Sequence, residues 1–101
     1  MIRSRKIRES ARGEDCTMNS PRCNYDPATS SWCHSNFQEH GKGVGHKAHD
    51  IMGFIGCSGC HYWFDIESRQ GVSKLERALA FYRAWAKSII RLFEKGVIKI
   101  A

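Results

Sequence analysis

The sequence lacks a long apolar run. The N-terminal residues 1–15 are charged and contain no hydrophobic segment, which argues against a secretory signal. No later run is long and apolar enough to cross a bilayer, and we find no internal repeat and no low-complexity segment. At 101 residues the chain is too short for a catalytic domain plus a separate binding domain. We therefore expect a single domain, 1–101, that stays in the cytoplasm and has no membrane partner.

What the sequence does contain is a concentration of cysteine and histidine. All five cysteines and all five histidines lie within residues 15–72, together with both prolines and seven of the nine glycines. Such a segment is predicted to be rich in loops and short strands, with too little apolar area to hold itself together. In a reducing compartment, clustered thiols indicate a metal site more often than disulfides.

The cysteine spacing predicts one structural zinc site. Cys57 and Cys60 form a C-x2-C knuckle, and Cys16 and Cys23 lie upstream at a wider spacing that a proline turn can close. Four thiolates suit Zn²⁺ because this ion is redox-inert, accepts tetrahedral sulfur ligands and lowers thiol pKa values. Cys33 is the fifth cysteine and is an alternative member of the site.

The composition divides the domain into three segments. Residues 1–14 are predicted to be a basic arm that becomes ordered only against the body or a ligand. Residues 15–72 are predicted to hold the zinc and catalytic core, with short strands within 31–37 and 51–55 and a glycine-rich, basic loop at 41–47. Residues 73–96 are predicted to form a C-terminal amphipathic helix.

This helix has clear start and stop signals. Ser73 and Glu76 fit a capping box, and Gly96 stands at a favourable C-terminal position. Its basic side chains are expected on a solvated face, and its aromatic residues in the core or at a subunit contact. The predicted apolar stripe comprises Leu75, Leu79, Tyr82, Trp85, Ala86, Ile89 and Phe93.

Two histidines are candidates for catalysis. His34 lies in the first predicted strand, and His61 follows the knuckle at the start of a short helix, so the two imidazoles are expected to face each other. Such a pair suits phosphodiester hydrolysis, in which one histidine accepts a proton from water and the other holds a divalent ion such as Mg²⁺ or Mn²⁺. Asp50 and Asp65 are the local carboxylates, and we expect Asp50 to assist the ion because it begins the second strand. His61 is alternatively a substitute zinc ligand.

The net charge of +6 and the sequence pI near 9.3 favour a polyanionic partner, DNA or RNA. A merely solvated basic surface would have the same composition. The side chains expected to contact phosphates lie in the arm and the glycine-rich loop: Arg3, Arg5, Lys6, Arg8, Lys42 and Lys47.

The order Cys16, Cys23, His34, Asp50, then Cys57-x-x-Cys60-His61, resembles the HNH (His-Me finger) nucleases whose ββα-metal site is braced by a four-cysteine zinc. More closely, runs 8–16, 21–24, 57–61 and 95–99 resemble a family of small lambdoid phage and prophage proteins described as candidate nucleases. The resemblance covers nearly the whole chain. It implies an α+β, HNH-like treble-clef fold in a bacterial host cell, a structural zinc, a general base at His34 and a catalytic metal at His61. Cys33 stands where many HNH enzymes have an acidic metal ligand.

Three functions compete at this point. The leading one is a metal-dependent endonuclease that acts on branched or replicating phage DNA. The alternatives are a zinc-stabilised DNA or RNA adaptor without turnover, and a protein-interaction adaptor that uses the terminal helix. A pure adaptor has no need for an imidazole and a carboxylate beside an open coordination position, so His34 and Asp50 discriminate between them. The oligomeric state is not predicted.

Overall fold

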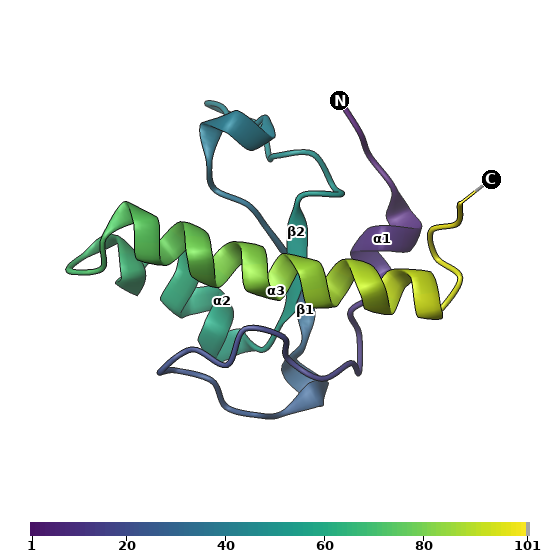
Figure 1. The fold of residues 1–101 in the computed structure, drawn as a ribbon, viewed down its shortest axis with the longest axis horizontal. Coiled ribbons are helices and arrows are strands. Elements are labelled where there is room, and N and C mark those ends of the chain that lie inside the picture. Colours follow the sequence, from purple (N-terminus) through teal and green to yellow (C-terminus); the bar gives the residue numbers. More distant parts are fainter. Residues whose placement is uncertain (101) are drawn as a thin grey trace.

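The computed structural model describes residues 1–100, which form a small α+β domain (Figure 1). None of its helices is long and apolar enough to cross a membrane. The α-helices and strands in this part of the chain are α1 (Arg5–Glu9), β1 (Ser31–His34), β2 (Gly53–Gly56), α2 (Ser58–Asp65) and α3 (Lys74–Glu94). Single turns of 3₁₀ helix occur at η1 (Pro27–Thr29), η2 (Gln38–His40) and η3 (Glu67–Arg69).

The two strands pair antiparallel, with Trp32 opposite Ile55 and His34 opposite Gly53. They occupy the two predicted regions but are shorter than the apolar runs. β1 ends at His34 because Ser35 turns the chain: its N–H donates to the carbonyl of Met52, and its hydroxyl accepts from the N–H of Phe37. The histidine is thereby left at the end of its strand.

The sheet is small but covered on both faces, which explains why every residue of β2 is buried. On one face Phe54 packs with Phe64 of α2 and Phe81 of α3, with ring centroids 5.5–6.0 Å apart. On the other face Ile55 packs in a second cluster with Ile7, Ala11, Trp32 and Leu92. The edge-to-face contacts of Phe54 each contribute about 0.5–1.5 kcal/mol beyond burial of area. Together the two clusters fix β2, and with it the start of α2.

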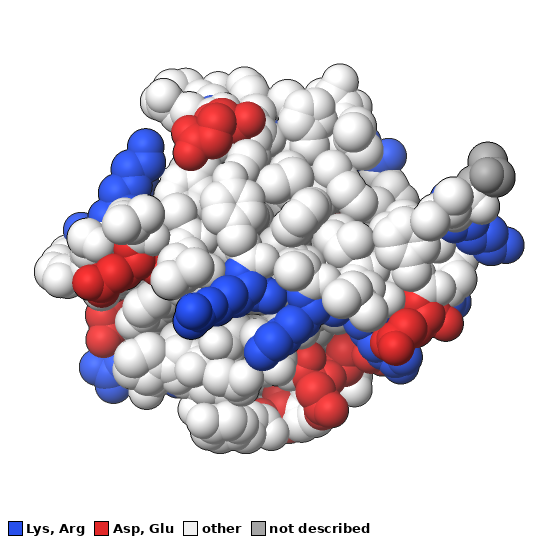
Figure 2. Space-filling model, viewed as in Figure 1, with Lys and Arg blue, Asp and Glu red and all other residues white. Residues whose placement is uncertain are grey.

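Helix α3 crosses in front of the strands (Figure 1) and begins as predicted. The Ser73 side chain accepts from the N–H of Glu76, and Gly96 adopts a positive φ of 73° after the last turn. The predicted apolar stripe is only partly right: Trp85 and Ile89 pack against the two core clusters, but the helix is rotated from the predicted face. The buried residues are Phe81, Ala84, Ser88 and Leu92, whereas Leu75 is 79% exposed. Figure 2 shows an uncharged area along the upper side of this helix and Lys or Arg side chains along the lower side of its middle part.

The basic N-terminal segment lies against the body of the domain. Ser4 caps α1 by accepting from the N–H of Ile7, and the side chains of Ile7 and Ala11 are buried. The backbone N–H of Asp50 donates to the carbonyl of Ile2, which ties the segment to the chain before β2. The two ends of the described part of the chain lie on the same side of the molecule (Figure 1).

Candidate active site

The four cysteines predicted to bind zinc come together. The sulfur atoms of Cys16, Cys23, Cys57 and Cys60 all lie within 4.8 Å of one another. None of the cysteines is in a disulfide. Such a set of thiolates could hold a metal such as zinc. Cys33 is buried in β1 and is not part of the cluster.

The surroundings of the cluster favour a thiolate at Cys16 and at Cys57, whose pKa values are lowered. Backbone N–H groups of Ser20 and Asn24 donate to the sulfur atoms of Cys60 and Cys57, at 3.3 and 3.4 Å. A hydrogen bond from Cys60 lowers the pKa of Cys16 to about 4 and raises that of Cys60, as expected when two thiols share a proton. Between the knuckle cysteines, a Cβ at Gly59 would collide with the carbonyl oxygen of Arg22. The residues therefore fit a metal that replaces the shared proton.

The knuckle also sets the direction of α2. Cys57 is the N-cap of this helix, and its side chain accepts from the N–H of Cys60. His61 follows one residue later, so the cysteine cluster holds the first turn of the helix on which this histidine lies. The position of His61 thus depends on the integrity of the cluster.

His34 and His61 line the same cavity, which has a volume of about 560 Å³. Its lining comes from the segment around α1, from β1, from the loop after η2 and from α2 and η3. Five of the lining residues are Lys or Arg: Arg8, Arg12, Lys42, Lys47 and Arg69. The remainder are Ser30, Ser31, Trp32, His34, Ser35, Asn36, His61 and Asp65.

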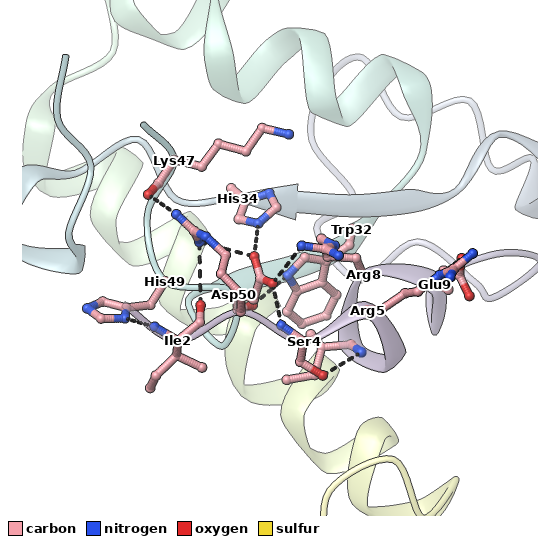
Figure 3. Close-up of polar contacts among 12 residues, drawn as sticks. Ile2, Ser4, Arg5, Arg8, Glu9, Trp32, His34, Lys47, His49 and Asp50 are labelled. Carbon is pink, nitrogen blue, oxygen red and sulfur yellow. Dashed lines mark hydrogen bonds and ion pairs between the residues drawn. The ribbon is translucent and has the colours of Figure 1, made fainter. Parts of the chain in front are cut away.

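His34 forms a close pair with Asp50. Its Nε2 lies 2.7 Å from Oδ1 of the carboxylate (Figure 3), and the Asp50 side chain is only 1% exposed. Because an ionised carboxylate only accepts, Nε2 carries the proton and donates it to Asp50. The lone pair of His34 is then on Nδ1, the ring atom that does not face the carboxylate.

The carboxylate of Asp50 is held by several further donors (Figure 3). Arg3 and Arg8 lie at 3.2 and 3.3 Å from its oxygens, and the N–H of Ser4 donates to it at 2.6 Å. Burial acts to raise the pKa of Asp50, but the hydrogen bonds from His34 and Ser4 and the charge of Arg8 outweigh it and keep the pKa below its usual value. Asp50 is therefore an ionised, fixed acceptor.

His61 pairs with Asp65 and not with Asp50. The two residues are four apart on α2, and Nε2 of His61 lies 2.9 Å from Oδ2 of Asp65. Hydrogen bonds to Asp65 and then to Cys33 raise the pKa of His61 to about 10. The carboxylate of Asp65 thus favours a positive charge at this point of the cavity.

Asp65 is positioned in turn by residues outside α2. The side-chain amide of Asn36 donates to Oδ1 of Asp65 at 3.4 Å, and its oxygen accepts from Arg77 of α3 at 2.9 Å. Arg77 also donates to Ser68. A chain of polar contacts therefore connects α3 to the His61–Asp65 pair.

The predicted phosphate contacts divide into two groups. Arg8, Lys42 and Lys47 line the cavity. The lining does not include Arg3, Arg5 or Lys6. The guanidinium of Arg3 donates to the carbonyls of Lys47 and Ala48 as well as to Asp50, and that of Arg5 pairs with Glu9. The guanidinium of Arg3 is thus engaged by groups of the protein itself.

Sequence reasoning missed Arg12, Arg69 and Asn36 in the cavity and ranked Asp65 below Asp50. The signal for Asp65 was present, since its spacing of four from His61 predicts a shared helix face. Arg12 lies in the turn that follows α1, so helical spacing from Arg8 does not place it. No local pattern marks Arg69 or Asn36.

Comparison with known proteins agrees with a nuclease. The family described as "Putative nuclease YbcO" matches residues 5–97. A solved structure, described as "Structure of a putative bacteriophage protein from Escherichia coli str. K-12 substr. MG1655", is similar with a TM-score of 0.68 and 26% identity, over 90% of this chain and 100% of that one. No curated protein matches the sequence. Since the family match spans nearly the whole chain, this protein belongs to the family described as "Putative nuclease YbcO".

Proposed function

We propose that the protein is a metal-dependent endonuclease that hydrolyses phosphodiester bonds in DNA, with a core of β1, β2 and α2 of the HNH type. The observation that carries the proposal is the pairing of His34 with a buried carboxylate beside a cavity rich in arginine and lysine. The similar bacteriophage protein and the family's description support a role in phage or prophage DNA metabolism.

His34 is the proposed general base. Asp50 holds the proton on Nε2, so that Nδ1 is free to accept a proton from the attacking water. The imidazolium that forms is stabilised by the same carboxylate. Asp50 thus acts through His34 as a positioning residue, and its contacts favour this role over the metal-binding role expected from the sequence.

His61 and Asp65 are the proposed ligands of a catalytic Mg²⁺ or Mn²⁺. An imidazole and a carboxylate oxygen 2.9 Å apart can bind the same ion once the proton between them is lost. Such an ion would neutralise the charge that develops on the leaving oxygen. Cys33, which contributes to the raised pKa of His61, would bias the site toward softer metals.

The basic side chains of the cavity are the proposed phosphate contacts. Arg8, Arg12 and Arg69 would bind phosphates through planar guanidinium groups, and Lys42 and Lys47 would contribute from the loop before β2. Zn²⁺ in the four-cysteine cluster would act only on structure, because four thiolates leave no open position.

A plasmid-nicking assay with Mg²⁺, Mn²⁺ or Zn²⁺ tests the proposal. Wild type should nick supercoiled plasmid, and His34→Ala should lower the rate by about 100-fold or more, the usual contribution of a positioned base. Zinc content and DNA affinity should be unchanged in this variant, and it should still unfold cooperatively, although loss of the hydrogen bond to Asp50 lowers its stability. His46→Ala is the matched control, because His46 is exposed and lies outside the cavity lining.

Two results would contradict the nuclease. One is that wild type nicks no DNA in any of the three metals. The other is that His34→Ala cleaves as fast as His46→Ala. In either case a zinc-stabilised nucleic-acid adaptor would be the better description.

A further inference from the structure

A second, smaller cavity lies beside the first and shares part of its wall. It has a volume of about 320 Å³. Ser31, His61 and Asp65 line both cavities, so the His61–Asp65 pair forms part of the boundary between them. The residues that line only the smaller cavity are Thr29, Ser58, Tyr62 and Ile66. A strand bound with its phosphodiester at the pair would extend from one cavity toward the other.

The two cavities differ in charge. The larger one is lined by five Lys or Arg residues, whereas the described lining of the smaller one contains none. The one carboxylate of the smaller cavity belongs to Asp65, which is paired with His61. A phosphate would have no cationic side chain to bind there beyond this histidine. The smaller cavity therefore suits an uncharged part of the substrate.

Two apolar side chains give the smaller cavity its surface. Tyr62 is 52% exposed and Ile66 is 50% exposed. Their spacing of four residues puts them on one side of α2, next to the side that carries His61 and Asp65. An aromatic ring beside an aliphatic side chain offers a flat apolar surface to a ligand.

Polar groups also line this cavity, and hydrogen bonds hold them in place. The hydroxyl of Thr29 accepts from the N–H of Ser58 at 3.2 Å and donates within its own turn, to Asp26 at 2.9 Å. The hydroxyl of Ser58 accepts from the side-chain amide of Asn24 at 2.9 Å and has a proton to donate. A flat apolar ligand with acceptors on its edge matches this arrangement, and a nucleobase has this chemistry.

We propose that the smaller cavity binds an unpaired nucleobase of the DNA strand, stacked on Tyr62 beside Ile66. The inference rests on the proposed nuclease function and extends it to the substrate class. In a duplex both faces of a base are covered by its neighbours, so a base can stack on Tyr62 only when it is unstacked. The enzyme should therefore prefer single-stranded or branched DNA to intact duplex.

Binding of short oligonucleotides without added Mg²⁺ or Mn²⁺ tests this site independently of cleavage. The probes are a thymidine oligonucleotide, a strand of equal length made of abasic nucleotides, and a duplex of that length. Wild type should bind the thymidine strand about tenfold more tightly than the abasic strand, a typical effect of stacking one base on an aromatic side chain. Tyr62→Ala should remove this difference, and Tyr62→Phe should retain it.

Phe93→Ala is the control for loss of an exposed aromatic ring, since Phe93 lines neither cavity. Zinc content and thermal unfolding of each variant verify the fold. The inference is overturned if Tyr62→Ala weakens both strands equally, if it weakens neither, or if wild type does not distinguish the strands. Base-dependent binding without any nicking would contradict the proposed nuclease alone, and nicking without base-dependent binding would contradict the base site alone.

Discussion

Nε2 of His34 lies 2.7 Å from Oδ1 of Asp50, and Arg3 and Arg8 bind the same buried carboxylate. One residue thus orients the proposed base and also anchors the N-terminal segment. Asp50→Asn should therefore affect both activity and stability. The lost charge leaves buried donors less well satisfied, at a cost of about 1–3 kcal/mol in the free energy of unfolding. Chemical denaturation measures this change.

The effect of Asp50→Asn on cleavage should be large, because an amide no longer holds the productive tautomer of His34. Loss of the carboxylate in a comparable triad lowers the rate by about 10⁴, which sets the upper end of the range expected here. In a His34→Ala background, Asp50→Asn should cause little further loss of cleavage. Additive losses in the double variant would mean that Asp50 does not act through His34.

Zinc removal should unfold the domain. We expect about one zinc per chain and loss of cooperative unfolding in Cys57→Ser, because the cluster fixes the start of α2 and supplements a small core. Elemental analysis and thermal melts in the presence and absence of a strong chelator measure this. Cys33→Ser is the matched control and should retain its zinc, since Cys33 lies outside the cluster. A chelated protein that melts as sharply as the holo form would contradict the structural role.

The features that could be predicted from sequence are those set by local spacing. The cysteine knuckle at Cys57 and Cys60, the capping box at Ser73 and the two short strands all depend on nearby residues. The buried face of α3 could not be identified in this way, because apolar residues occur on more than one side of the helix. The structure buries Ser88, whose hydroxyl accepts from the N–H of Ile55 at 2.9 Å, and this close approach to β2 requires a small polar side chain.

The contacts of the candidate site likewise divide into those that local spacing predicts and those that depend on the fold. Local spacing could connect His61 with Asp65, but the pairing of His34 with Asp50 is formed across the connection between the strands. The hydrogen bonds of the Arg3 guanidinium likewise depend on the carbonyls of Lys47 and Ala48, which are distant in sequence. No periodic pattern in the sequence predicts these long-range contacts.

DNA affinity should depend steeply on salt, and the residues lining the cavity should account for the slope. Lys42→Ala and Lys47→Ala should each reduce the slope of log affinity against log salt by about 0.9 where the lysine neutralises one phosphate. Lys74→Ala, on the exposed start of α3, should leave it unchanged. Fluorescence anisotropy over a salt series checks this. Equal slopes for all variants would show that the basic lining does not contact phosphates.

Arg3→Ala should behave differently from the lysine variants. Because its guanidinium binds backbone carbonyls and Asp50, its loss should lower stability more than it lowers the salt slope. Urea denaturation together with the same anisotropy series separates the two effects. A reduced slope at unchanged stability would place Arg3 among the phosphate contacts after all.

His40 should make stability depend on pH. This buried histidine hydrogen-bonds to the hydroxyl of Ser35 through Nδ1, at 2.6 Å, and to the hydroxyl of Tyr82 through Nε2, at 2.8 Å, and the neutral ring satisfies both by donating through one nitrogen and accepting through the other. Burial lowers its pKa, although nearby Glu39 opposes the shift. A lowered pKa in the folded state means that the unfolded chain binds the proton first. The contribution of His40 is therefore complete above the unfolded pKa of about 6.5 and is lost as the pH falls below it.

Comparison with His40→Gln isolates this contribution, because the other histidines and the thiolates titrate in both proteins. Wild type should be more stable than the variant at pH 7.5, and the difference in the free energy of unfolding should shrink between pH 6.5 and pH 5. Urea midpoints measured at several pH values, with zinc present throughout, provide the test. A difference that stays constant or grows toward pH 5 would mean that the folded protein accommodates a protonated His40, and that the contacts with Ser35 and Tyr82 do not select the neutral form.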